Sequence, residues 1–160
     1  MTDIINPHDK CFHQLMTRID NARAFFKRYL TAELQAIIDL DTLQLQQGSK
    51  VTAAFQKLHM DILYRVDFKA PKGHTKPQQG YLYCVVEHQS TPDPAMAVRL
   101  LQYKAALLME HVQNEYLPPI HSLVFYHGTA TPYPYTLDLR TCFRTPQQAE
   151  YTLQGPPQLI

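Results

Sequence analysis

Four polar residues stand at the ends of two apolar segments and could do chemistry together. Glu87, His88 and Gln89 follow the apolar run "YLYCVV", and Asp61 directly precedes "ILYRV". In a strand, side chains two residues apart project to the same face, so Glu87 and Gln89 are expected to lie together while His88 points the other way. If the two strands pair, the carboxylate of Asp61 comes close to that of Glu87.

Two carboxylates and the backbone carbonyl oxygen of His88 form the oxygen-rich ligand set that Mg²⁺ or Mn²⁺ prefers. Such an ion polarises a phosphoryl oxygen and lowers the pKa of a bound water, which phosphodiester hydrolysis requires. Acids and glutamines at strand ends also occur by chance. The residues alone therefore leave open the alternative of polar strand ends without a catalytic role.

Hydrophobic periodicity predicts the elements at the start of the chain. Apolar residues at helical spacing over 9–40 predict two helices or one bent helix, with Thr31 as a candidate N-cap. The segment 40–49 is predicted to be a short exposed strand or an extended piece. Over 60–68, alternation predicts a strand whose residues Ile62, Tyr64, Val66 and Phe68 share one face.

The second half of the chain predicts a crossover between two strands. Residues 69–80 are rich in Pro, Gly, Lys and Gln and predict a hairpin loop, and 81–89 predicts an interior strand buried on both faces. A helix is expected next, with Ser90 or Asp93 as N-cap and Pro94 at its first position. A further strand ends near Gly128, and it should pair with 81–89 in parallel within a mixed sheet.

Composition bounds the class of protein. The chain has 160 residues, 45% of them hydrophobic and 18% charged, as in one globular domain. A net charge of +1 gives no general reason to expect nucleic-acid binding, and the three scattered cysteines predict reduced thiols. No apolar run is long enough to cross a bilayer and no secretory signal is recognisable, so a cytoplasmic protein without membrane contact is expected.

The segments, taken in order, resemble a known family. They are "HDKCF" (8–12), "YL" (29–30) with "DLDTLQL" (39–45), "MDILYRV" (60–66), "VVEHQSTPDPAMAVRLLQY" (85–103) and "LVFYHG" (123–128). In this order they resemble the recombination-promoting nucleases (Rpn), also described as transposase-like, within the PD-(D/E)xK nuclease superfamily. The resemblance implies an α/β fold with a restriction-endonuclease-like core, a mixed β-sheet flanked by helices. It also implies metal-dependent DNA cleavage linked to recombination or transposition.

The resemblance also implies roles for individual residues. Asp61 takes the place of the first motif carboxylate, Glu87 that of the second acid, and Gln89 that of the motif lysine. This last substitution departs from the superfamily pattern, because a glutamine orients by hydrogen bonds and brings no positive charge. The general base is thereby left undefined.

Arg99 and Tyr103 lie four residues apart, hence on one face of the predicted helix. As part of the family pattern they could hold a phosphate or support Glu87, but Arg99 could equally be a structural ion-pair partner. Local positive charge for DNA could come from the loop 69–80 or from the first helices, and a solvated surface is an equal alternative. The candidates are Lys69, Lys72, Lys76, Arg23, Lys27 and Arg28.

The prediction that follows is a nuclease-like domain over 1–128 and a C-terminal extension over 129–160, either cut from a longer protein or ending in a loose tail. The leading function is a Mg²⁺-dependent DNA endonuclease, with DNA as partner and a homodimer as one arrangement. In it Asp61, Glu87 and the carbonyl of His88 bind the ion, Gln89 orients water or phosphate, and Arg99 and Tyr103 support the site. The alternative is a catalytically silent module that keeps the fold for DNA or protein binding.

Overall fold

A four-stranded sheet forms the centre of the protein. The computed structural model describes residues 7–46, 62–70, 72–87 and 92–154. The strand order is β1-β2-β3-β4, with antiparallel pairing of β1 with β2 and of β2 with β3, and parallel pairing of β3 with β4. The strands are β1 (Ile38–Leu45), β2 (Ile62–Phe68), β3 (Gln78–Glu87) and β4 (Ile120–Tyr126). The predicted mixed sheet and its parallel crossover are confirmed.

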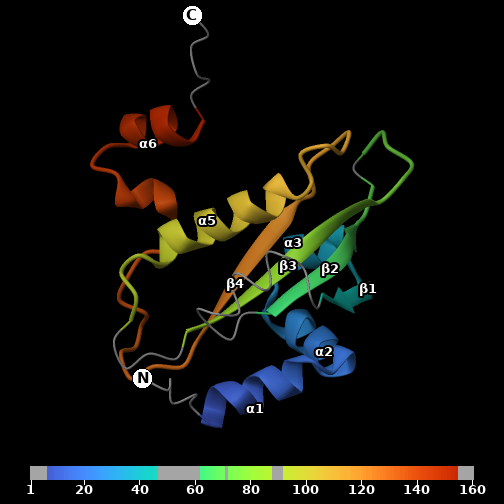
Figure 1. Cartoon of the computed structure of the whole chain (residues 1–160), viewed down its shortest axis with the longest axis horizontal. Helices are drawn as coiled ribbons and strands as arrows, with labels where there is room; N and C mark the ends of the chain where they lie inside the picture. The colour runs from blue at the N-terminus through green and yellow to red at the C-terminus, as the bar shows by residue number, and fades with distance from the viewer. Residues whose placement is uncertain (1–6, 47–61, 71, 88–91, 155–160) are drawn as a thin grey trace, which may run out of the picture.

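Helices cover both faces of this sheet (Figure 1). The helices are α1 (Pro7–Met16), α2 (Ile19–Tyr29), α3 (Ala32–Ile37), α5 (Met96–Met109), the short 3₁₀ helix η1 (Leu139–Cys142) and α6 (Pro146–Leu153). Helices α1 and α2 lie on one side of the sheet, and α5 crosses the other side. The α/β fold class is confirmed, and the arrangement is consistent with a restriction-endonuclease-like core.

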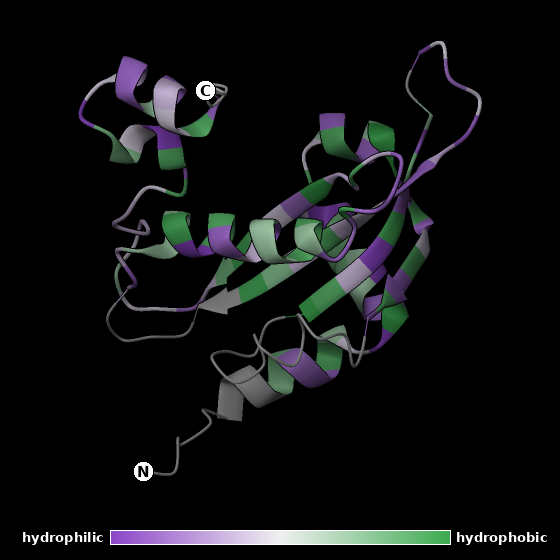
Figure 2. Cartoon of the chain, turned by 45° about the horizontal axis from the view of Figure 1, so that its top comes forward, coloured by the Kyte–Doolittle hydropathy of each residue, from purple (hydrophilic) through white to green (hydrophobic). Residues whose placement is uncertain are grey.

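Alternation along the strands divides the apolar residues between two cores. Ile62, Tyr64 and Val66 of β2 pack with α1, α2 and β1, and this confirms their predicted shared face. Leu63 points to the opposite face and joins β3 and α5. From Tyr81 to Val85, β3 is buried on both faces, as predicted for an interior strand. Figure 2 shows hydrophobic residues along α5 and along the strands beneath it.

The first helical region contains three helices where the sequence predicted two or one bent helix. Helix α2 ends at Tyr29, and α3 begins after Thr31. The hydroxyl oxygen of Thr31 accepts a hydrogen bond from the backbone N–H of Leu34 at 3.4 Å, and this confirms Thr31 as an N-cap. A new cap only a few residues after the end of α2 lets the chain turn toward the sheet edge.

Strand β1 is less exposed than predicted. The segment was expected to be exposed over 40–49, but the strand runs from Ile38 to Leu45 and buries Ile38, Leu40 and Leu43. Its residues pack with α2 in the first core, and the Arg23 side chain donates a hydrogen bond to the carbonyl of Leu40 at 3.1 Å. The prediction failed because the cover comes from another element, helix α2, and the strand's own pattern does not reveal that contact.

Helix α5 begins two residues later than predicted. Pro94 lies in a turn before the helix, and Ala95 occupies the N-cap position without a side-chain cap. Asp93 instead stabilises this turn, because its carboxylate accepts a hydrogen bond from the backbone N–H of Ala95 at 2.8 Å. Ser90, the other predicted cap, lies outside the described residues. Proline therefore precedes the helix here and is not its first residue.

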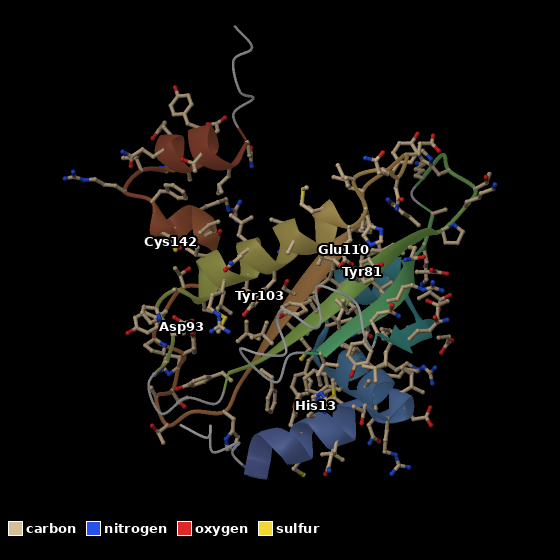
Figure 3. The ribbon with its side chains drawn as sticks, in the orientation of Figure 1. His13, Tyr81, Asp93, Tyr103, Glu110 and Cys142 are labelled. Carbon is tan, nitrogen blue, oxygen red and sulfur yellow. The ribbon has the colours of Figure 1, made fainter. Side chains whose placement is uncertain are left out.

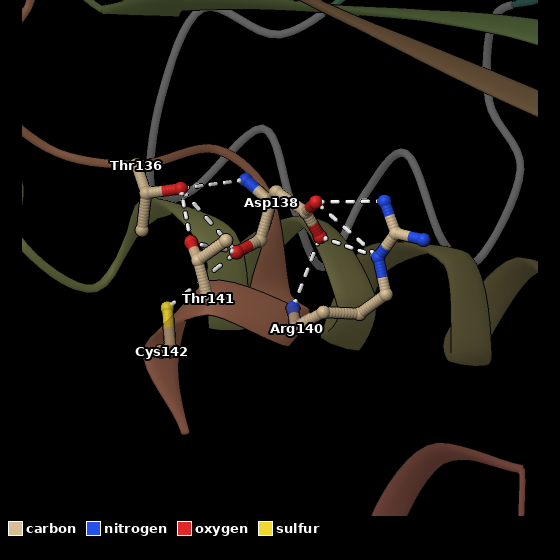
Figure 4. A network of polar contacts seen from close by, with 5 residues as sticks. All are labelled: Thr136, Asp138, Arg140, Thr141 and Cys142. Carbon is tan, nitrogen blue, oxygen red and sulfur yellow. Dashed lines mark hydrogen bonds and ion pairs between the residues drawn. The ribbon is translucent and has the colours of Figure 1, made fainter. Parts of the chain in front are cut away.

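The C-terminal segment, predicted only as an extension, contains two helical pieces, η1 and α6. Asp138 caps η1 and also pairs with Arg140, and the hydroxyls of Thr136 and Thr141 lie 2.7 Å apart beside them (Figure 4). Helix α6 begins with a reciprocal capping box between Thr145 and Gln148. The sequence "TPQQ" carried this signal, with a threonine cap, a proline at the first turn and a glutamine at the third position.

Tyr64→Phe is expected to lower the free energy of unfolding by about 1–2 kcal/mol, because it leaves a buried carbonyl without its donor. Tyr64 is fully buried, and its hydroxyl donates to the carbonyl of Met16 at 2.5 Å, which ties the end of α1 to the sheet. Urea unfolding at pH 7 measures the change. Tyr116→Phe, at a tyrosine that is 72% exposed, is the matched control and should change nothing.

The same tyrosine predicts a pH dependence. Burial, with a smaller effect of Cys84, raises the pKa of Tyr64 above its ordinary value. The unfolded chain ionises this group near pH ~10, while the folded protein keeps it neutral to higher pH. The stability that the neutral Tyr64 contributes to the folded state is complete below that pH and is lost as the pH rises further. Tyr64→Phe should therefore remove part of the alkaline loss of stability.

Candidate active site

The β2–β3 hairpin brings the start of β2 and the end of β3 to the same end of the sheet. Ile62, the residue after Asp61 in the chain, pairs with Cys84 of β3, and Glu87 is the last residue of β3. This confirms the hairpin pairing on which the predicted approach of the acids depends. Asp61, His88 and Gln89 lie outside the described residues, and Glu87 is described by its backbone alone. The meeting of the carboxylates stays a prediction.

The strand register shows which part of the fold adjoins this end of β3. Tyr81, Tyr83 and Val85 pack in the core formed with α5, and Glu87 is the next odd-numbered position of the strand. In the parallel pairing of β3 with β4, Glu87 lies opposite Tyr126. Helix α5 and the end of β4 therefore supply the neighbouring side chains.

Arg99 and Tyr103 lie on one face of α5, as predicted, and their side chains interact. The Nε and Nη2 atoms of Arg99 donate to the hydroxyl of Tyr103 at 3.3 and 3.1 Å. The Nη1 atom donates to the Asp93 carboxylate at 2.6 Å, and both side chains of this ion pair are less than one-fifth exposed. Figure 3 shows Asp93 and Tyr103 on this side of the fold. Of the two roles left open for Arg99, these contacts favour the structural one.

Electrostatics agrees with a structural Arg99. Burial by itself would lower the pKa of Arg99, but the hydrogen bonds to Asp93 and Tyr103 outweigh it and hold that pKa above its ordinary value. The guanidinium is therefore a permanent cation that Asp93 neutralises locally. An arginine whose donors are engaged in this way presents less free charge to a phosphate.

Two tyrosines extend this network toward the end of β4. The Tyr133 hydroxyl donates to the backbone carbonyl of Asp93 at 2.9 Å, and its ring packs edge-on against that of Tyr126 at 4.9 Å. Neither tyrosine is among the site residues predicted from the sequence. The only sequence signal for Tyr126 was its place in "LVFYHG", at the end of the strand that follows α5.

The basic candidates lie in two separate places. Lys69, Lys72 and Lys76 lie in the loop that joins the end of β2 to the start of β3. Glu87 lies at the other end of β3. Because a strand rises about 3.3 Å per residue, that loop lies roughly 30 Å from the Glu87 end of β3. Arg23 on α2 pairs with Asp20 at 3.1 Å and with Asp41 at 3.5 Å. The structure thus does not bring the loop lysines together with the candidate site.

The described residues hold no second candidate for a metal centre. Within them, no group of three or more His, Cys, Asp and Glu side chains is placed to hold an ion. Cys11, Cys84 and Cys142 are free thiols, as predicted. Across the described part of the chain, no helix combines the length and apolar character needed to span a membrane.

The fold defines a class of protein, an α/β domain whose mixed sheet and flanking helices are consistent with a restriction-endonuclease-like core. Residues 6–160 match the family model described as "Putative transposase, YhgA-like". The chain belongs to this family, which confirms the resemblance read from its sequence.

Curated relatives agree with this assignment. The chain is 34% identical to recombination-promoting nuclease RpnC of Escherichia coli (strain K12), over 96% of this chain and 50% of the relative. It is 35% identical to RpnA of the same strain, over 89% of this chain and 47% of the relative. A third relative, the inactive recombination-promoting nuclease-like protein RpnE, is 35% identical over 90% of this chain and 46% of its own length. The chain therefore spans about half the length of these relatives. No solved structure matches it significantly.

Proposed function

We propose that this chain is a metal-dependent DNA endonuclease domain with a role in recombination. The observation that carries the proposal is the antiparallel β2–β3 pairing, in which the residue after Asp61 pairs three positions before Glu87. Family membership and relatives named as recombination-promoting nucleases support it. DNA is the proposed substrate, and cleavage of both strands would use two copies of the chain because each copy supplies one such site.

The donor set suits a small divalent ion. Asp61 and Glu87 would hold Mg²⁺ or Mn²⁺ through carboxylate oxygens, with the backbone carbonyl of His88 as a further hard ligand. When bound, the ion supplies Lewis-acid polarisation of the phosphate. Gln89 would orient water or a phosphate oxygen by hydrogen bonds, since its amide both donates and accepts. Arg99 and Tyr103 would support the site by fixing the start of α5 next to the end of β3.

A second candidate is a catalytically silent nuclease-fold module that binds DNA or protein. Gln89 stands where the superfamily motif has a lysine, and one relative of similar identity is named inactive. A glutamine cannot place positive charge beside the developing negative charge of the reacting phosphate. A silent module is therefore the specific alternative to a nuclease, and the two candidates differ in the expected response to metal and to plasmid DNA.

Metal removal separates the two candidates. The chain is incubated with supercoiled plasmid in Mg²⁺ or Mn²⁺, and in EDTA or Ca²⁺ as controls. Nicked and linear products are expected with Mg²⁺ or Mn²⁺ and should be absent in EDTA. A bound ion should also raise the melting temperature, with about 2.7 kcal/mol of stabilisation at a concentration 100 times the Kd. A chain that gains no stability from millimolar Mn²⁺ and leaves the plasmid intact is the silent module.

A further inference from the structure

Helix α5 is apolar on the side that faces away from the sheet as well as on the side that packs against it. The residues buried against the sheet are Met96, Ala97, Leu100, Tyr103 and Leu107. On the opposite side, Val98 is 55% exposed, Leu101 45% and Met109 68%, and Ala105 between them is also exposed. A surface helix normally turns charged side chains toward water, so an apolar outer face indicates a second contact.

The charged side chains of α5 lie off this outer face. From Met96 to Met109 the helix has two charged residues, Arg99 and Lys104. Arg99 is largely buried and pairs with Asp93. Lys104 directly precedes Ala105 and is therefore rotated from it by about 100° around the helix axis. The outer face thus lacks the positive charge with which a protein binds DNA or an anionic membrane.

The order of side chains along the outer face suits a second copy of the same helix. Val98, Leu101, Ala105 and Met109 follow one stripe at helical spacing, and Val112, 55% exposed in the turn after the helix, continues it. The stripe is symmetric in side-chain size about Ala105. Leu101 and Met109 are each four residues away from this alanine, and Val98 and Val112 are each seven residues away.

This symmetry has a direct consequence for two antiparallel helices related by a two-fold axis at Ala105. Leu101 of one copy would lie opposite Met109 of the other, and large side chains would meet on both sides of the axis. Val98 would lie opposite Val112 in the same way. The small side chain of Ala105 would let the two helices approach closely where they cross.

We propose that the outer face of α5 is the interface at which two copies of this chain associate, with the two-fold axis at Ala105. A two-fold axis brings each nearby residue close to its own copy, so a charged residue there would meet its like charge. The uncharged outer face satisfies this condition. None of these residues belongs to the candidate metal site, so the proposed dimer does not depend on the proposed nuclease activity.

The size of the face sets the expected affinity. From Val98 to Val112 the stripe is about 21 Å long, at a rise of about 1.5 Å per residue. One helix face of this length buries less than the roughly 800 Å² per partner of a standard interface. A weak dimer with a micromolar Kd is therefore expected, and it should form as the protein concentration is raised.

The first test is sedimentation velocity of the 160-residue chain in EDTA, over about 1–300 µM protein. The sedimentation coefficient of the parent chain should rise with concentration toward that of a dimer. Ala105→Glu should raise the dimer Kd about tenfold or more, because two carboxylates would face each other at the axis. Ala24→Glu is the matched control, at an exposed alanine of α2 on the other side of the sheet, and should associate like the parent.

A parent chain that stays monomeric throughout this range overturns the inference. An Ala105→Glu variant that associates as strongly as the parent overturns it too, because another surface would then join the copies. Since no metal is present, a chain that dimerises in this way but leaves plasmid intact in Mg²⁺ contradicts only the proposed nuclease activity.

The second test reverses the charge to examine the two-fold axis itself. Ala105→Lys alone should weaken association as Ala105→Glu does. An equal mixture of the two variants should associate more strongly than either alone, because opposite charges then meet at the axis. Glutamate and lysine both favour helix, so both variants should stay folded, which circular dichroism verifies. A mixture of folded variants that stays monomeric overturns the inference and leaves the outer face to a different partner.

Discussion

Glu87→Gln is expected to lower Mg²⁺-dependent nicking of supercoiled plasmid by about a thousandfold or more. The change keeps the size of the side chain but replaces one carboxylate oxygen by an amide nitrogen, and it removes the charge that would hold the ion. Loss of the ion removes several kcal/mol of transition-state stabilisation, and about 4 kcal/mol corresponds to a thousandfold in rate. Asp61→Asn should have an effect of the same order, because both acids are proposed to bind one ion. Initial rates of nicking, measured across a range of Mg²⁺ and Mn²⁺ concentrations, test both substitutions.

The matched control is Asp67→Asn, in strand β2 and six residues after Asp61 in the sequence. Asp67 lies near the far end of the hairpin and pairs across the strands with Gln79, not with the end of β3. The Asp67→Asn variant should nick plasmid at the parent rate. Circular dichroism and melting temperature verify that each variant is folded. Nicking that persists in both Glu87→Gln and Asp61→Asn would show that cleavage uses other residues or a contaminant.

Local pattern was enough to predict the hairpin and the interior strand. The alternation of Ile62, Tyr64 and Val66 reports the burial of one face directly, and the loop 69–80 leaves antiparallel pairing as the simple connection. The apolar run before Glu87 required cover on both faces, and the helices on the two sides of the sheet provide it. These features depend on residues close in sequence, so they can be predicted from one sequence alone.

The features that the sequence did not predict depend on contacts that hydrophobic periodicity does not report. Strand β1 is buried by a helix that precedes it, and the start of α5 is set by Asp93, whose carboxylate is shared between Ala95 and Arg99. The pairing of Glu87 with Tyr126 joins positions 39 residues apart in the chain, and no spacing rule gives that register. Helix α6 is a different case, because its capping box was local and was overlooked among the prolines.

The residues of the candidate site were predictable only in part. Glu87 and Asp61 could be selected from residue type and strand position, and the hairpin that relates them is present. The role of Arg99 could not be decided from its spacing to Tyr103, because an arginine four residues before a tyrosine suits a phosphate clamp and an ion pair equally. The deciding partner, Asp93, lies in the turn before the helix.

Arg99→Met is expected to lower the free energy of unfolding by about 2–4 kcal/mol, since it leaves the largely buried Asp93 carboxylate without its counter-ion. The Asp93–Arg99 pair is 2.6 Å long, with side chains 19% and 16% exposed. Arg140→Met is the matched control: Arg140 also pairs with an aspartate, at 2.8 Å, but the two side chains are 70% and 43% exposed. Exposed ion pairs contribute little, so this variant should unfold at the parent midpoint. Urea unfolding at pH 7 measures both.

The double variant Arg99→Met/Asp93→Asn tests the cause. If the loss in Arg99→Met comes from an unpaired buried charge, removal of that charge should restore part of the stability, so the double variant should be more stable than Arg99→Met alone.

Plasmid nicking, measured well below the melting temperature of each protein, then decides between the two roles of Arg99. A structural arginine predicts that nicking by the folded Arg99→Met protein stays within about tenfold of the parent rate, because its contacts to Asp93 and Tyr103 act on the position of α5 and not on the phosphate. Unchanged stability together with a thousandfold loss of nicking would instead place the guanidinium on the DNA, and the ion pair with Asp93 would then be a resting state that substrate displaces.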